Sequence, residues 1–169
     1  LAFLSRGDTA EALRHTKALA TALNERKLPR IYTTSLTYYN IAEIALTLWE
    51  ASIDAHEMQQ LAQRCHIGLQ QNVKIFPVAR PIYKIVDAHI QLLGQQHHGL
   101  EQQLKRAAKE AKRHGLLEYH GIACHLLART QRMHNHHYAA SFEQARHIFT
   151  TLGLRYHLRQ LYVNFEDMR

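Results

Sequence analysis

The feature that most constrains the fold is a helical pattern that returns along the chain at intervals of slightly more than forty residues. Its clearest copy covers residues 138–154, where apolar residues spaced three and four apart form one face of a helix and Gly153 follows as a stop signal. Matching glutamates mark this copy and three earlier ones, at spacings of 46, 44 and 42 residues (Glu11, Glu57, Glu101 and Glu143). Such a period is typical of an array of similar units.

The helices that precede two of these copies also match each other. When residues 38–49 are shifted by 44, they align with residues 82–93, and Tyr39 meets Tyr83. Each unit is then a pair of helices with a stripe too apolar to leave in water, and stacking of neighbouring pairs buries that stripe. The chain has 46% hydrophobic residues but only 7 Gly and 3 Pro, which also favours helices. We predict an all-α protein, a right-handed superhelix of about four antiparallel helical hairpins, the first incomplete, closed by a capping helix over residues 154–165.

Start and stop signals give the expected helix boundaries. Residues 1–8 are typical of the tail of a helix followed by a turn at Gly7. Capping-box sequences at 8–11 and 54–57 each open a helix, and prolines at 77 and 81 suit the first turn of another. The expected helices cover approximately residues 9–27, 30–52, 54–74, 77–94, 101–114, 117–133, 138–152 and 154–165.

Two segments carry a family resemblance. GDTAEAL at residues 7–13 and FEQARHIFTTLG at residues 142–153 resemble tetratricopeptide repeats of the elongated kind, found in large bacterial ATP-dependent regulators such as the LuxR-type activators. In that family an ATPase module precedes the repeats, which serve as a sensor or protein-binding arm. The resemblance implies that residues 1–169 form a single helical-repeat domain, a non-catalytic protein- or ligand-binding scaffold module of a bacterial signalling or transcription regulator.

Polar residues interrupt the apolar first helices at positions that match in the 44-residue alignment, and two further residues continue the stripe on the 117–133 helix. They are Asn40, Glu43, Thr47, Lys84, Asp87, Gln91, His125 and Arg129. A spacing of three and four places each set on one helix face. We predict that they line a wet concave groove that binds a protein or peptide partner or another small polar ligand. The alternative is a solvated groove in a spacer array that binds nothing.

A second candidate surface is basic. Five cations lie close together in the 101–114 helix (Lys105, Arg106, Lys109, Lys112 and Arg113), in a chain whose net charge is +7. A nucleic-acid-binding helical array would use such a face to contact phosphates. The aromatic residues that single-strand readers interleave with their cations are missing here. We therefore prefer the interpretation of a solvated outer face and keep nucleic acid as the alternative function.

Signals for catalysis are lacking in the sequence. The seven glycines are scattered, and no Gly-Lys-Ser or Gly-Lys-Thr occurs to cradle a phosphate. Carboxylates such as Glu11 and Asp54 lie at helix starts, where capping and the helix dipole explain them. Cys65 and His66 are neighbours and therefore point to different helix faces, which argues against a Cys–His nucleophile pair. We predict a protein that is not an enzyme and that uses no cofactor.

Two groups of residues have metal-ligating side chains at close spacing (His134, His136 and His137; His120 and Cys124). Such groups can chelate a transition metal. No Cys-x-x-Cys or His-Glu-x-x-His motif accompanies them. Solvated turn histidines and half-buried packing explain them more simply, so we predict no metal site.

The chain begins with apolar residues, Leu1, Phe3 and Leu4, in what reads as the last turns of a helix. We expect the C-terminal part of a longer repeat protein, with self-association through this apolar N-terminal end as a further expectation. Two cysteines make no disulfide framework. No stretch approaches the roughly 20 apolar residues that a membrane span needs. These features indicate no membrane contact and a cytoplasmic location.

Overall fold

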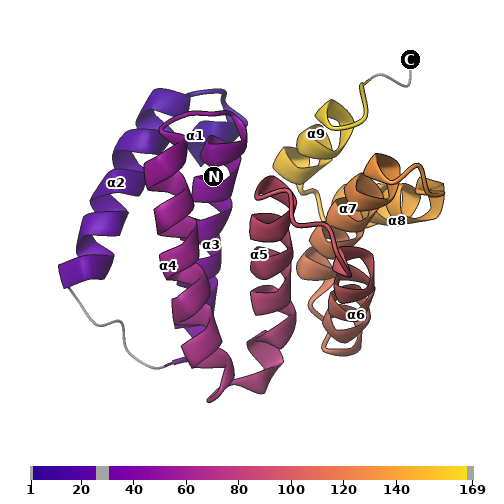
Figure 1. Cartoon of the computed structure of the whole chain (residues 1–169), viewed down its shortest axis with the longest axis horizontal. Helices are drawn as coiled ribbons and strands as arrows, with labels where there is room; N and C mark the ends of the chain where they lie inside the picture. Colours follow the sequence, from indigo (N-terminus) through magenta and orange to yellow (C-terminus); the bar gives the residue numbers. More distant parts are fainter. Residues whose placement is uncertain (1, 26–30, 167–169) are drawn as a thin grey trace.

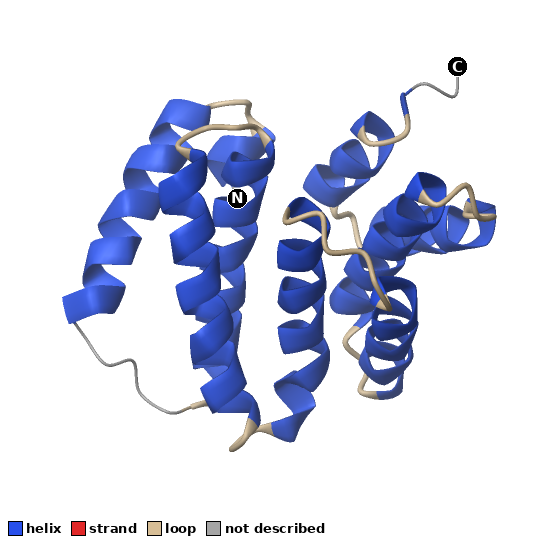
Figure 2. Cartoon of the chain, in the orientation of Figure 1, coloured by secondary structure: helices blue, strands red, loops and turns tan. Residues whose placement is uncertain are grey.

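The computed structural model describes residues 2–25 and 31–166, and within these ranges it contains helices and no strand (Figure 2). The predicted all-α class is therefore confirmed. The α-helices are α1 (Ala2–Ser5), α2 (Thr9–Glu25), α3 (Tyr32–Glu50), α4 (Ala55–Val73), α5 (Arg80–Leu93), α6 (Leu100–Arg113), α7 (Leu117–Met133), α8 (Ala139–Thr151) and α9 (Arg155–Val163), and the 3₁₀ helix η1 (Pro77–Ala79) precedes α5. Each expected helix is present within a few residues, and the expected connection around residues 26–30 lies outside the described residues.

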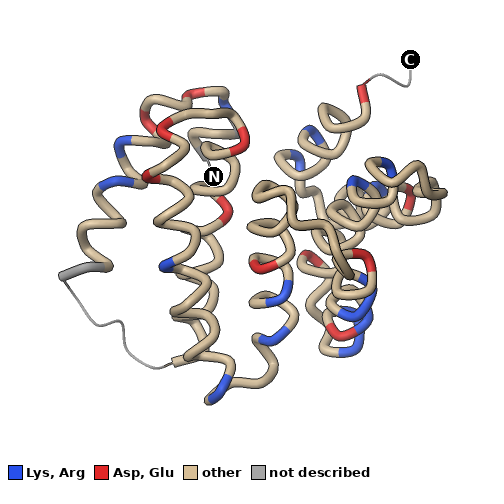
Figure 3. The backbone as a smooth tube through the Cα atoms, viewed as in Figure 1, with Lys and Arg blue, Asp and Glu red and all other residues tan. Residues whose placement is uncertain are grey.

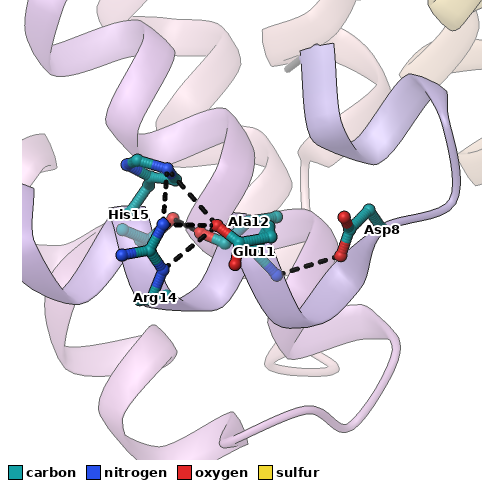
Figure 4. A network of polar contacts seen from close by, with 6 residues as sticks. Asp8, Glu11, Ala12, Arg14 and His15 are labelled. Carbon is teal, nitrogen blue, oxygen red and sulfur yellow. Dashed lines mark hydrogen bonds and ion pairs between the residues drawn. The ribbon is translucent and has the colours of Figure 1, made fainter.

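Of the two predicted capping boxes, the one at residues 8–11 caps its helix through the Asp8 side chain. The Asp8 carboxylate accepts a hydrogen bond from the Glu11 backbone N–H at 3.1 Å, while the Glu11 side chain binds Arg14 and lies near His15 (Figure 4). The prediction that Asp54 caps α4 is wrong. Asp54 has a left-handed backbone with φ of 50° and makes no side-chain cap. Its carboxylate instead lies 2.5 Å from Lys17 Nζ, so it links α4 to α2.

Most of the longer helices end in the same turn. The second residue after the helix takes a left-handed conformation with φ between 55° and 71°, at Ser52, Gln95, Gly115, Asn135 and Gly153. The next backbone N–H then donates to a carbonyl five residues back, as Leu116 does to Ala111 at 2.9 Å. This hydrogen bond satisfies a carbonyl that the helix end would leave without a partner. The chain therefore reverses tightly, and consecutive helices can lie side by side.

Consecutive helices pack against each other along the chain, and the first helix of each pair also contacts the next first helix, α3 with α5 and α5 with α7 (Figure 1). The core between them is apolar and fully buried, with Leu46, Leu69 and Ile85 among its largest side chains. Fully burying such a side chain contributes about 1.5–3 kcal/mol each. None of the helices in the described ranges is long and apolar enough to cross a bilayer.

The last helix, α9, contacts both α8 and the beginning of the described chain. Leu161 and Phe165 are buried, as the apolar seam predicts, and α9 packs on α8. It also contacts α1 at the opposite end of the sequence, and in Figure 1 it lies on the α1 side of α7. At the N-terminus Leu4 is buried and Phe3 stacks on His15, whereas Leu1 lies outside the described residues. Part of the apolar N-terminal segment is thus covered by the chain's own helices.

Candidate functional site

The strongest candidate site is a polar recess enclosed by the first helices α3, α5 and α7 together with α9. We call it the central recess. Its lining combines apolar walls (Leu46, Ile85, Val86, Ile122 and Leu126) with the polar residues Tyr39, Glu43, Thr47, Glu50, His89, His125, Arg129, His157, Gln160 and Asn164. Four of the eight predicted groove residues meet here, namely Glu43, Thr47, His125 and Arg129.

Glu43 is the more buried carboxylate of the recess, with only 11% of its side chain exposed. Burial raises its pKa to about 7, an effect opposed by His157 and reinforced by the carboxylate of Glu118. His157 lies between the two acids, with Nδ1 3.4 Å from Glu43 and Nε2 3.5 Å from Glu118. Since a carboxyl with a pKa near 7 exchanges its proton easily at neutral pH, Glu43 can act either as a donor or as an acceptor.

The second acidic group, Glu50, is held by a cation. Burial would raise its pKa, but His89 and Arg129 outweigh that effect and lower it to about 2. Arg129 of α7 donates to both Glu50 oxygens, so the pair joins α7 to α3. Burial lowers the pKa of His89 and lowers that of His125 well below its usual value. Both imidazoles are therefore neutral at pH 7, and the recess offers hydrogen bonds more than net charge.

The remaining side of the recess is closed by α9. Thr47 donates to the Glu43 carbonyl at 2.9 Å, and the Tyr156 hydroxyl lies 3.0 Å from Thr47 Oγ1. At the other end Arg132 of α7 donates to the Asn164 carbonyl at 2.7 Å. These bonds hold α9 and the residues after it against α3 and α7.

Three polar atoms inside the recess have no hydrogen-bond partner among the described residues: Glu43 Oε2, His89 Nε2 and His125 Nε2. His89 Nε2 is 3.8 Å from Glu50, too far for a hydrogen bond. The cavity beside them measures about 50 Å³. This space accepts water or the polar tip of a larger molecule.

The other predicted groove residues lie elsewhere. Lys84 makes an ion pair with Glu110 of α6 at 2.6 Å. Asp87 accepts from Gln91 at 2.8 Å and from Gln103 of α6 at 2.7 Å. These polar groups therefore join α5 to α6.

The remaining predicted groove residue, Asn40, is exposed on α3 and does not line the central recess. The predicted stripe is thus divided between the recess, a contact between two helices and the surface.

Sequence reasoning missed six of the ten polar residues that line the recess: Tyr39, Glu50, His89, His157, Gln160 and Asn164. Glu50 follows Thr47 by three positions and could have been found by extending the stripe one turn. His89 aligns with the buried Ala45 in the 44-residue alignment, so no matching polar position pointed to it.

The basic residues of α6 occupy one exposed side of that helix (Figure 3). The five cations are all exposed, while Leu104, Ala107 and Ala111 face the core. Lys105 lies 3.6 Å from Glu101, and Lys112 and Arg113 lie in the last turn, where the helix dipole favours cations. The basic face is therefore accessible, and ordinary helix electrostatics account for part of it.

Neither cysteine offers a reactive thiol. Burial raises the pKa of Cys65 and of Cys124 to about 12, so both remain protonated at neutral pH. Cys124 donates to Gln144 at 3.5 Å and packs in the core with His120. His66 stacks on Tyr83, on a different face from Cys65.

No family model, curated protein or solved structure matches this chain.

Proposed function

We propose that the protein is a non-catalytic binding module, a tetratricopeptide-like superhelix that serves as the sensor or partner-binding arm of a bacterial regulator. Support comes from the repeated helix pattern, from the contacts of α3, α5 and α7 in sequence order, and from the family resemblance of its first and last hairpins. In this proposal the central recess receives a hydrogen-bonding group of a peptide partner or of a small polar ligand.

The observation that carries this proposal is the set of three unpartnered atoms around the recess. A buried polar atom without a partner costs about 1–3 kcal/mol, and native proteins retain few of them. Glu43 Oε2, His89 Nε2 and His125 Nε2 come from three different helices and border one cavity of about 50 Å³. A ligand that supplies matching donors and acceptors would recover that cost on binding.

The size of the recess favours binding over catalysis. Perturbed groups such as Glu43 are common in active sites. Pockets that enclose a whole small molecule, however, typically measure about 300–1,000 Å³. A cavity of about 50 Å³ admits only the end of a side chain or a similar group. The ligand would therefore lie mainly on the surface and anchor one polar group inside.

The test is a selection of binding peptides from a random displayed library, followed by affinity measurements on paired variants. Glu43→Gln keeps the volume of the side chain but removes its ionisation. Glu143→Gln makes the same change on exposed α8, where Glu143 pairs only with Arg146 in the described part of the chain. We expect peptides that use the recess to lose about tenfold in affinity with Glu43→Gln, the loss of one hydrogen bond to a charged group, and none with Glu143→Gln. Equal affinity for both variants would refute the recess as the binding site.

The alternative function, binding of nucleic acid through Lys105, Arg106, Lys109, Lys112 and Arg113, makes a different prediction. Affinity governed by phosphate contacts falls steeply as salt is added. Titration of generic DNA and RNA at low and moderate salt, with Lys109→Gln as the variant, therefore separates the two functions. No binding at low salt would eliminate the alternative.

A further inference from the structure

A second cluster of polar side chains lies outside the central recess, where the start of α6 meets the turn after α7. Nδ1 of His136 is 2.5 Å from Oε1 of Glu101, and Nδ1 of His134 is 3.4 Å from the same oxygen. One potential ligand atom from each of the three residues lies within 4.8 Å of the other two. Two imidazoles and one carboxylate thus converge on a single point from elements 33 residues apart in the chain.

The backbone fixes both histidines at this point. They flank Asn135, whose left-handed φ of 55° reverses the chain after α7. The N–H of His136 donates to the Gln131 carbonyl at 2.8 Å, which closes the turn. Opposite them, Glu101 follows Leu100, a fully buried residue in the first turn of α6. The three ligands therefore come from short, well-anchored segments and need little reordering to act together.

The surroundings of the cluster contain a further imidazole and a competing cation. The ring of His97 packs edge-on against His134 with centroids 5.9 Å apart, and its Nδ1 is buried without a hydrogen-bond partner among the described residues. Lys105 is the nearby positive charge, 3.6 Å from Oε2 of Glu101. Because the Nδ1 atoms of both histidines lie close to Oε1 of Glu101, that oxygen can bind a metal while Oε2 keeps its contact with Lys105.

We propose that Glu101, His134 and His136 form a binding site for a divalent transition metal, with Zn²⁺ as the expected ion. Two histidines and one carboxylate are a known protein ligand set for Zn²⁺, which binds them at about 2.0–2.2 Å and accepts a fourth ligand. Water or His97 supplies that fourth position. The bound ion would link the first turn of α6 to the turn between α7 and α8.

The simplest rival is a set of hydrogen bonds and ion pairs without metal. In that case one imidazole N–H donates to Glu101, and the histidines bind Zn²⁺ no better than exposed histidines elsewhere. The chain has 14 histidines, so weak binding of Zn²⁺ at scattered sites is expected in any event. The experiment must therefore locate the ion as well as detect it.

The test is calorimetric titration of the metal-stripped protein with ZnCl₂ at pH 7.5, together with NMR of the histidine rings. Variants Glu101→Gln, His134→Asn and His136→Asn each remove one ligand. His56→Asn is the matched control, because His56 is an exposed helical histidine that contacts Gln60. Thermal melting without metal shows that each variant folds, and His97→Asn tests the fourth position.

We expect one saturable Zn²⁺ site in the wild type, ring signals of His134 and His136 that shift first, and at least a tenfold loss of affinity in each ligand variant. Affinity should also fall as the pH is lowered, because a metal must displace the protons of its imidazole ligands. Mg²⁺, which prefers oxygen ligands, should not compete. Equal affinity in His136→Asn and wild type, a similar loss in His56→Asn, or no saturable binding below about 1 mM would each overturn the site.

Discussion

The substitution Glu43→Gln measures how much the ionised Glu43 carboxylate of the central recess destabilises the folded protein. In the folded protein the pKa of Glu43 is raised from 4.5 to about 7, mainly by burial, while Tyr39, His157 and Glu118 also face the carboxyl. In the unfolded chain the group returns to its ordinary pKa. Between these two values the folded state holds a proton that the unfolded state has lost. The free energy of unfolding therefore falls as the pH rises from about 4.5 to about 7.

The size of this effect follows from the pKa values. A change from 4.5 to about 7, at about 1.4 kcal/mol per pKa unit, is worth about 3 kcal/mol. Only 11% of the side chain is exposed, so screening by solvent reduces this little. Glutamine has nearly the same volume and never ionises. We therefore expect Glu43→Gln to gain stability relative to wild type as the pH rises, by about 3 kcal/mol between pH 4.5 and pH 8.

Urea unfolding of both proteins at several pH values, followed by circular dichroism, gives the difference in free energy of unfolding directly. Other titrating groups, including Glu50, act in both proteins and largely cancel in the difference. Glu143→Gln provides the control on an exposed side chain and should give a difference that is independent of pH. A flat difference for Glu43→Gln as well would refute the argument that burial raises the pKa of this carboxyl.

Three further predictions concern packing, capping and the thiols. Gly121→Ala places its Cβ 2.7 Å from the fully buried Phe149, so overpacking of about 1–3 kcal/mol should exceed the gain of about 1 kcal/mol in helix propensity and lower the urea midpoint. Gly68→Ala, whose Cβ meets the half-buried ring of Tyr38, should cost less stability because that ring can move outward. A larger loss of stability for Gly68→Ala than for Gly121→Ala would contradict the packing argument. Asp8→Ala removes the cap of α2 and should lower the free energy of unfolding by about 1 kcal/mol in urea titrations. An unchanged free energy of unfolding would show that the cap does not stabilise the folded protein. Both cysteines should react with a thiol reagent at neutral pH only as fast as the chain unfolds, and rapid labelling of the folded protein would contradict their burial.

Local sequence signals were sufficient to predict the helices and most of their ends. Apolar residues three and four apart define a helix face wherever the chain places it, and the glycine that ends α8 favours a left-handed turn through its own backbone freedom. The cap at Asp8 is also local, since donor and acceptor lie three residues apart. Asp54 shows the limit of such signals, because its carboxylate forms an ion pair with Lys17 of α2 instead of capping α4.

The contents of the central recess depended on the rotation of each helix about its axis. The alignment paired Thr47 with Gln91 and Glu43 with Asp87, but α5 places Asp87 between α4 and α6 and presents His89 to the recess. That rotation is set by how the apolar faces of α4, α5 and α6 fit together, so the position of a polar residue within one repeat does not decide it.

Assembly of the two candidate sites required contacts that local sequence does not encode. The return of α9 brings His157 to Glu43, more than one hundred residues away, and the packing of α6 on α7 brings Glu101 to His134 and His136. Local sequence determined the helices and turns because their hydrogen bonds join residues only a few positions apart. The tertiary structure decided the ligand sets because they join side chains whose distance depends on how every intervening helix packs.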